Sequence, residues 1–256
     1  VRLGGAKFWL DGNPVLAWMS KPFAVPPPGR DKDFHGYSQI TDEVLFKAFD
    51  EHWTTPFQIN MHLNGDEAVE QALRAIEAAV ARHGMRDHRP VFVHCAYVRP
   101  DQIARMKALG AIPSFLTISL FNQGDDLAPI FGAERMATTN ATASMQRAGI
   151  PFTLSHDAPV TPPEILPLVW AATQRTTQGG QVLAPEQRID AYTALRAVTA
   201  DAAFQIREET TKGTLEVGKL ADFVVLDRNP LKIPAAQIRD VAVVQTIKEG
   251  RAVFTA

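Results

Sequence analysis

Short apolar runs alternate with amphipathic segments along most of this chain. Segments such as TDEVLFKAFDEHW and DEAVEQALRAIEAAVARHG place apolar residues at helical spacing, and Thr41 and Gly84 supply a start and a stop signal. This alternation predicts a parallel sheet with right-handed helical crossovers. The runs that we interpret as strands are RLGGAKFWL (2–10), FQINMH (57–62), PVFVHC (90–95), AIPSFLTIS (111–119) and PFTLSHD (151–157).

The pattern changes after about residue 211. The segments KGTLEVGKLADFVVLDRNPL and VAVVQTIKEGRAVFTA are typical of short strands and turns, with a hairpin at Glu249-Gly250. A length of 256 residues with 46% hydrophobic content fits one large domain with a small appendage. We therefore predict an α/β fold with a partial (β/α) barrel over residues 1–211 and a small β segment over residues 212–256.

Candidate metal ligands stand at the ends of the predicted strands. They are Lys7, His62, His94 and Asp157, and each closes an apolar run before loop-like sequence. A (β/α) barrel builds its active site in this way, because side chains at the carboxyl ends of several strands converge on one mouth. Imidazole and carboxylate without thiolate suit a divalent ion such as zinc.

Strand alternation decides which side chains face inward. His62 shares the polar face of its strand, Asp157 shares a face with Thr153 and Ser155, and Lys7 shares one with Trp9. The same alternation predicts that Phe92 faces inward together with His94. A bare Lys inside a barrel would be costly, and carboxylation would turn it into an anionic ligand.

Each of these residues also has a plainer interpretation. A single strand-end His is more often a hydrogen-bonded core or loop residue than a ligand. Asp66 precedes a strongly helical segment and is interpreted as its N-cap. His88 stands among arginines after that helix, which favours a solvated turn, and Cys95 is interpreted as a small buried apolar residue.

Charge and hydropathy exclude several classes of partner. The net charge is −2 and no basic run occurs, so we expect no nucleic-acid partner. No apolar run approaches the roughly 18 residues of a membrane span, so we expect no membrane partner. A single cysteine permits no internal disulfide and agrees with a cytoplasmic location. The first residue is Val, so the sequence leaves a signal peptide upstream open.

Taken together, these segments resemble the amidohydrolase superfamily, and within it the branch of N-substituted formamide deformylases and D-aminoacylase-like proteins. KGTLEVGKLADFVVLDRNPL resembles the strand pair that returns the chain from barrel to β-sandwich. AKFWLDG, HLNGD, VFVHC and SHDAPVTPP resemble the family motifs of barrel strands four, five, six and eight. The resemblance implies that the chain forms strands 4–8 of a (β/α)8 barrel, followed by the C-terminal β segment of a composite β-sandwich.

The resemblance also implies roles for single residues. Lys7 would be a carboxylated lysine bridging two metals, and His62 and His94 would ligate the second metal. Asp157 would bind the first metal and act as general base on the attacking water. The expected activity is hydrolysis of C–N bonds in small amide or cyclic amide substrates with zinc. Candidate substrate contacts near strand ends are Trp9, Asp11, Tyr97 and Phe121.

One departure from the family pattern is large. The family's first strand carries a His-x-His pair, and none occurs in this chain. We therefore expect a C-terminal part of a longer enzyme, which alone holds at most one metal and is inactive. Its open sheet edges would be covered by the missing N-terminal part, a second copy or local rearrangement. The alternative is a catalytically incomplete, non-enzymatic barrel fragment.

Overall fold

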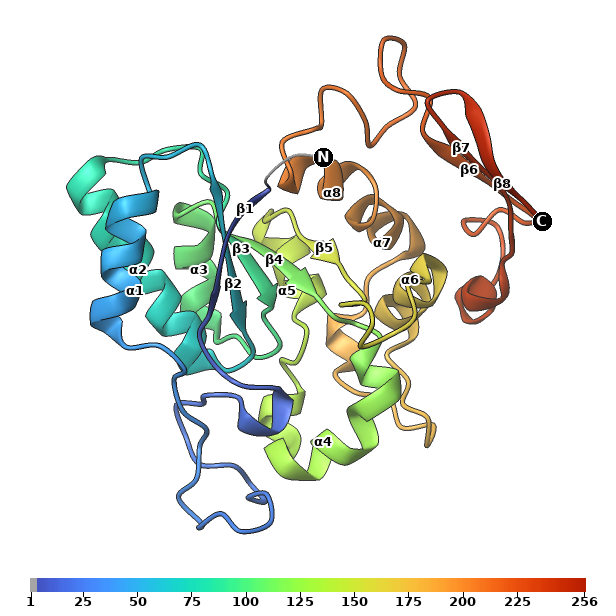
Figure 1. Ribbon diagram of the computed structural model, residues 1–256. Helices are drawn as coiled ribbons and strands as arrows, with labels where there is room; N and C mark the ends of the chain where they lie inside the picture. The colour runs from blue at the N-terminus through green and yellow to red at the C-terminus, as the bar shows by residue number, and fades with distance from the viewer. Residues whose placement is uncertain (1–3) are drawn as a thin grey trace.

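A parallel sheet forms the centre of the protein. The computed structural model describes residues 4–256, and Figure 1 shows its ribbon. The five strands of the sheet lie in chain order and every neighbouring pair is parallel. They are β1 (Gly5–Trp9), β2 (Gln58–Leu63), β3 (Val91–His94), β4 (Ile112–Phe115) and β5 (Thr153–Leu154). The mixed α/β fold with a parallel sheet is confirmed.

Helices connect successive strands, and the first three pack together on one face of the sheet (Figure 1). Thr41 caps the first helix by accepting the Val44 N–H at 3.4 Å, and Gly84 ends the second at a φ of 81°. Both signals were read from the sequence. The helices are α1 (Asp42–His52), α2 (Asp66–His83), α3 (Pro100–Ala108), α4 (Ser119–Met136), α5 (Thr142–Ala148), α6 (Ile165–Gln174), α7 (Ala191–Ala197) and α8 (Ala200–Gln205), with short 3-10 turns η1 (Pro14–Leu16), η2 (Pro185–Gln187) and η3 (Ala235–Asp240).

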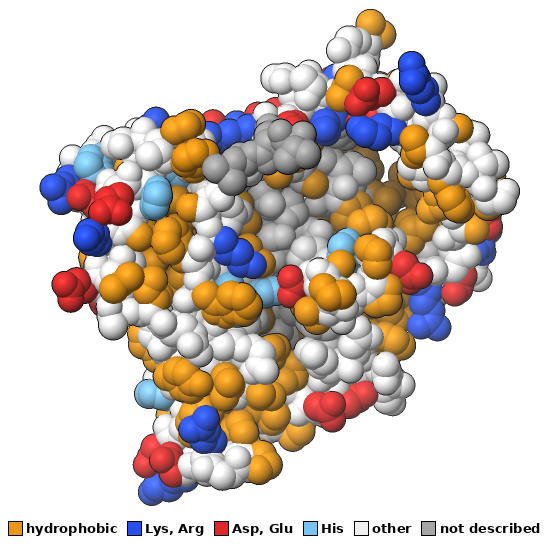
Figure 2. All heavy atoms as spheres, in the orientation of Figure 1, with side chains coloured by type: hydrophobic (Ala, Val, Ile, Leu, Met, Phe, Trp, Pro, Cys, Tyr) orange, Lys and Arg blue, Asp and Glu red, His pale blue; other side chains and the backbone are white. Residues whose placement is uncertain are grey.

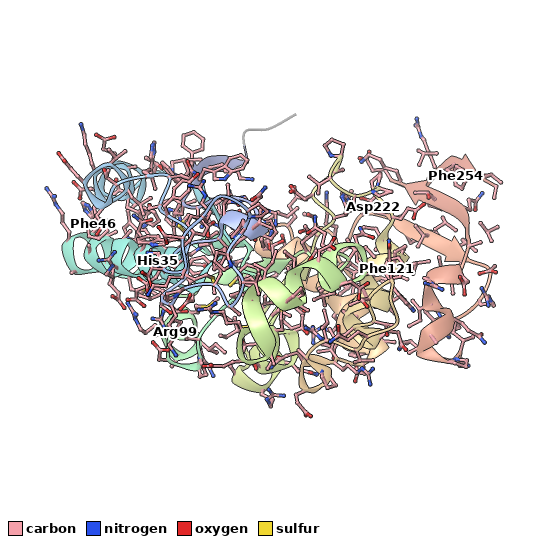
Figure 3. All side chains as sticks on the ribbon, turned by 90° about the horizontal axis from the view of Figure 1, so that it is seen from below. His35, Phe46, Arg99, Phe121, Asp222 and Phe254 are labelled. Atoms are coloured by element: carbon pink, nitrogen blue, oxygen red, sulfur yellow. The ribbon has the colours of Figure 1, made fainter. Side chains whose placement is uncertain are left out.

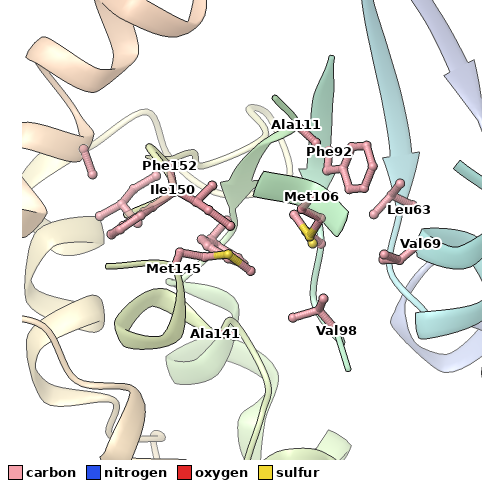
Figure 4. Close-up of a cluster of buried hydrophobic side chains, with 14 of the residues drawn as sticks. Leu63, Val69, Phe92, Val98, Met106, Ala111, Ala141, Met145, Ile150 and Phe152 are labelled. Atoms are coloured by element: carbon pink, nitrogen blue, oxygen red, sulfur yellow. The ribbon is translucent and has the colours of Figure 1, made fainter. Parts of the chain in front are cut away.

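The main core lies between the sheet and these helices. Phe92 is fully buried, and Figure 4 shows it beside Leu63 and Met106. In the strand register Phe92 pairs with Met61, whereas Val93 pairs with His62. Paired residues of neighbouring strands face the same side, so Phe92 faces the helices. The prediction that it faces inward with His94 is wrong.

Two local predictions are wrong because hydrogen bonds differ from those that the sequence pattern indicates. The fourth strand ends at Phe115 rather than near Ser119, because the Ser119 N–H turns back to the Leu116 carbonyl and α4 begins there. Gly65, not Asp66, is the N-cap of α2. The Asp66 carboxylate instead accepts the N–H of Ser20 at 2.9 Å and binds Arg99. It therefore ties the long loop after β1 to the start of α2.

This long loop packs against α4 in a second hydrophobic cluster. Its buried members include Met19 and Phe23 from the loop and Phe131 and Met136 from α4. Arg135 adds two hydrogen bonds, to the carbonyls of residues 21 and 22, each at 2.7 Å. Loop and helix thus form one wall beside the carboxyl ends of the strands.

An antiparallel sheet follows α8. Its strands are β6 (Phe223–Leu226), β7 (Val243–Lys248) and β8 (Arg251–Thr255), and β7 and β8 pair across Glu249 and Gly250. Both turn residues have positive φ, 50° and 76°, as a tight hairpin requires, so the predicted hairpin is confirmed. In Figure 3 Phe254 of β8 lies at the opposite end of the molecule from Phe46 of α1. Within residues 4–256 no helix combines the length and hydropathy needed to cross a membrane.

Candidate metal centre

The carboxyl ends of β2, β3 and β5 bring three of the predicted residues together. The ring centroids of His62 and His94 are 4.7 Å apart, and the rings meet edge to face. The His94 Nε2 atom lies 3.8 Å from an Asp157 carboxylate oxygen. Both imidazoles are nearly buried, whereas the Asp157 side chain is 40% exposed. Figure 2 shows basic, imidazole and acidic side chains gathered near the centre of this face.

Backbone conformation at the strand ends aims these side chains. In the strand register His94 pairs with Leu63, so an extended backbone would turn its ring toward the helices. His94 instead has a φ of 73° and Cys95 a φ of 44°, and the ring meets His62 on the opposite face. Asp157 also has a positive φ, 51°. Left-handed backbone at non-glycine residues costs free energy and is concentrated at functional sites.

Burial lowers the pKa of both imidazoles and so favours their neutral forms. Burial lowers the pKa of His62, and the charge of Lys7 lowers it further. Burial, followed by the neighbouring His62, lowers the pKa of His94 to about 4, although Asp157 opposes the shift. A neutral imidazole has a free lone pair, which is the form that binds a metal ion.

Lys7 and Trp9 lie on the same face of the sheet as His62. In the β1–β2 register Lys7 pairs with Asn60, and Trp9 pairs with His62. The Trp9 ring stacks on His62 at 4.5 Å, and the Lys7 Nζ atom lies 5.6 Å from the Trp9 ring. Both Lys7 and Trp9 are exposed, so this face of the sheet is open at β1.

Asp11 lies beneath this site and is fully buried. Its carboxylate accepts the backbone N–H groups of Trp18, Asn64 and Gly65 at 3.0, 2.9 and 2.7 Å. Burial raises the pKa of Asp11 to about 7, while the three N–H groups favour its carboxylate form. These bonds join the loops that follow β1 and β2. Asp11 therefore stabilises the packing of these two loops. Its predicted contact with substrate stays a prediction.

Tyr97 and Phe121 occupy different surroundings. Tyr97 is 3% exposed, packs on Phe131 and reaches the Met136 sulfur, and burial raises its pKa. Phe121 is half-buried against Trp170, with the Arg239 guanidinium over both rings. These three residues line an open pocket of about 320 Å³ beside the loop that carries Asp157. Phe121 therefore lines an open pocket, and Tyr97 belongs to the second core cluster and lines a small cavity together with His94. Their contacts with substrate stay predictions.

The residue types at this site suit a divalent ion, but their side chains are not arranged as a complete coordination sphere. Among residues 4–256 no group of three or more His, Cys, Asp or Glu is arranged to hold a metal ion. The His62 Nε2 atom lies 3.2 Å from the Gly12 carbonyl oxygen and 3.3 Å from the Asn64 amide. The distance of 3.8 Å between His94 Nε2 and the Asp157 carboxylate is a little longer than the roughly 3.4 Å between two ligands of one tetrahedral zinc ion. His62 would have to turn from Gly12 to join them.

Sequence reasoning missed the asparagine that supports His62. The Asn64 amide contacts both the Gly12 carbonyl oxygen, at 2.9 Å, and the His62 ring. The signal was present, because Asn64 stands two residues after His62 at the spacing of one strand face. His88 was expected in a solvated turn, and that prediction is wrong: it is 3% exposed and stacks on Trp53 at 4.6 Å. Cys95 is buried, as predicted.

A family model and the names of similar proteins indicate the same family. The model of the amidohydrolase family matches residues 1–254. YtcJ of Bacillus subtilis, whose name assigns it to the amidohydrolases, is 27% identical over 263 residues, which cover 99% of this chain and 47% of YtcJ. The N-substituted formamide deformylase of Arthrobacter pascens is 32% identical over 107 residues, which cover 42% of this chain and 20% of that protein.

A solved structure shows the same fold. An uncharacterized metal-dependent hydrolase from Pyrococcus horikoshii OT3 superposes with a TM-score of 0.79 at 24% identity, covering 91% of this chain and 46% of that one. The chain thus spans about half the length of YtcJ and of this hydrolase, and a smaller share of the deformylase.

Proposed function

Because this chain belongs to the amidohydrolase family, we propose that it forms part of a metal-dependent hydrolase that cleaves C–N bonds in small amide or cyclic amide substrates. The observation that carries the proposal is the meeting of two buried imidazoles and a half-exposed carboxylate at the carboxyl ends of β2, β3 and β5. The family match and the names of the relatives support hydrolysis as the reaction class.

In this proposal His62, His94 and Asp157 hold a divalent ion, most simply zinc, and Lys7 joins them as a carboxylated lysine. Such an ion, when bound, lowers the pKa of a water molecule and polarises the scissile carbonyl. Asp157 accepts the proton of the attacking water, because it is the exposed carboxylate beside His94. The exposed Trp9 ring, stacked on His62, offers a flat apolar surface to the substrate.

The proposal extends to the architecture. The five parallel strands would be strands 4–8 of a (β/α)8 barrel over residues 1–211, and residues 212–256 would complete a composite β-sandwich. Val224, Val253 and Phe254 of the antiparallel sheet are 50%, 61% and 49% exposed, which agrees with a covering partner. The free edges of β1 and β5 would be covered by further strands of the whole protein or by a second copy.

Zinc binding and amide hydrolysis by purified protein test the proposal together. We expect zinc to bind to the wild-type chain and to be lost in His94→Ala. His156→Asn is the matched control, because His156 neighbours Asp157 but its ring accepts the Ala158 N–H. Hydrolysis is expected only in the full-length protein with zinc. Equal zinc binding by wild type and His94→Ala would contradict the site, and zinc binding without hydrolysis in full-length protein would favour the non-enzymatic alternative.

A further inference from the structure

A small, partly open cavity has His94 in its lining. Its volume is about 30 Å³, which exceeds the roughly 10–15 Å³ that one water molecule requires. Apolar side chains such as Leu120 and Leu127 form part of its lining. The polar residues of its lining are Asn64, His94, Tyr97, Ser119, Thr139 and Asn140. Most of the lining surface is apolar, and these polar side chains are the groups that could bind a water molecule there.

Asn140 has a buried polar atom without a partner. The residue is 2% exposed, and its Oδ1 atom makes no hydrogen bond within residues 4–256. Its Nδ2 atom donates to the Thr139 hydroxyl at 3.3 Å. If oxygen and nitrogen of the amide were exchanged, the amide nitrogen would be left without an acceptor instead. Either way one polar atom of this side chain requires a partner, since a buried polar group without a hydrogen bond is destabilising.

The position of Asn140 is held by a buried arginine. Arg175 is fully buried and donates to the carbonyl oxygens of Thr139, Asn140 and Leu183 at 2.6, 3.1 and 2.9 Å. Asn140 itself has a φ of 45°, a conformation that asparagine tolerates better than most residues. Burial lowers the pKa of Arg175 to about 9. The three hydrogen bonds fix the backbone at residues 139 and 140.

Asn140 is also connected to the strand end that carries His94. Its backbone N–H donates to the Ala96 carbonyl oxygen at 2.8 Å, two residues after His94. The segment between them contains the left-handed residues His94 and Cys95. The same asparagine therefore binds the loop after β3 through its backbone and is part of the lining of the cavity.

We propose that this cavity is a built water site: an ordered water binds the Asn140 side-chain amide and contacts the His94 imidazole, so that Asn140 is a positioning residue for His94. The evidence for the water site is the cavity and the unpartnered Asn140 amide, and it does not depend on the proposed function. The consequence for metal affinity rests on the proposed function, in which His94 is a ligand. Groups that orient a ligating histidine typically change metal affinity by about 10–100-fold when they are removed.

The test combines crystallography with zinc titration on wild type, Asn140→Gly and Leu127→Ala. Glycine deletes the amide and accepts the positive φ without strain. Leu127→Ala is the control, because it enlarges the apolar lining of the same cavity and keeps the amide. We expect water density bonded to the amide in wild type and in the control. In Asn140→Gly we expect a displaced His94 ring and an apparent zinc dissociation constant about 10–100-fold higher, measured by chelator competition.

Three outcomes would overturn parts of this inference. A cavity without water density in wild type would refute the water site and leave the proposed metal function untouched. Wild-type zinc affinity and an unmoved His94 ring in Asn140→Gly would refute the positioning role. A loss of zinc affinity in Leu127→Ala equal to that in Asn140→Gly would show that packing, not the amide, is responsible. If wild type binds no zinc, the proposed function fails, and the water density still decides the cavity.

Discussion

The buried imidazole of His88 makes the stability of this protein depend on pH. Burial, followed by the charge of Arg207, lowers the pKa of His88 to about 4 from an ordinary value near 6.5. The folded protein therefore keeps this ring neutral at pH values where the unfolded chain protonates it. The free energy of unfolding is therefore highest above pH 6.5 and falls as the pH is lowered from 6.5 toward 4.

The size of this effect follows from the shift. Each unit of pKa shift corresponds to about 1.4 kcal/mol. Titration of His88 therefore lowers the free energy of unfolding by about 3 kcal/mol across this pH range. This is a large part of the roughly 5–15 kcal/mol by which a domain is stable. His88→Phe removes the titrating group and keeps a flat ring against Trp53, where the present rings are 4.6 Å apart and nearly parallel.

Urea denaturation at pH 7 and at pH 4.5 measures the effect. We expect the free energy of unfolding of wild type to fall by about 2–3 kcal/mol more than that of His88→Phe between these two values. His83→Phe is the control, because that ring is part of an ion pair with Asp50 at the surface and not of the core. An identical fall in wild type and His88→Phe would refute the assignment of the pH dependence to His88.

Other substitutions test the loops and the site. Asp11→Ala leaves the N–H groups of Trp18, Asn64 and Gly65 without their acceptor, so urea denaturation should show a loss of several kcal/mol, at about 1–3 kcal/mol per group; a change below about 1 kcal/mol would contradict the structural role. Gly65→Ala should destabilise the chain and lower its melting temperature, because an added Cβ would meet the Trp18 carbonyl, and an unchanged melting temperature would count against this packing. Asp157→Asn in the full-length enzyme should lower kcat by about 10²–10⁴-fold with an unchanged circular dichroism spectrum, and near-normal turnover would remove its role as base.

Much of the fold was visible in the sequence because it depends on local signals. The apolar runs gave the order of the strands, and capping residues such as Thr41 and Gly84 gave helix ends. Helix α4 was missed because Gly124, Pro129 and Gly132 interrupt its sequence, and Gly132 does leave the helical conformation at a φ of 76°. Structural features that depend on a few neighbouring residues, such as helix ends, are therefore predictable from the sequence.

The candidate site was predictable in its residues and not in its geometry. Strand-end position was enough to select His62, His94 and Asp157. Alternation alone placed Phe92 and His94 on one face, and the positive φ of His94 separates them. Such a conformation is imposed by tertiary contacts and leaves no mark in the apolar pattern. The burial of His88 likewise depends on Trp53, which is distant in sequence.

The most direct test of the account is an anomalous-scattering map of zinc-soaked crystals, recorded at the zinc absorption edge. The account predicts a peak bonded to His62 and His94, with zinc–nitrogen distances of about 2.0–2.1 Å and with Asp157 beside it. It also predicts that the His62 ring has turned away from the Gly12 carbonyl, its present neighbour at 3.2 Å. A map with no peak at these strand ends, or with zinc bound only elsewhere on the protein, would contradict the account.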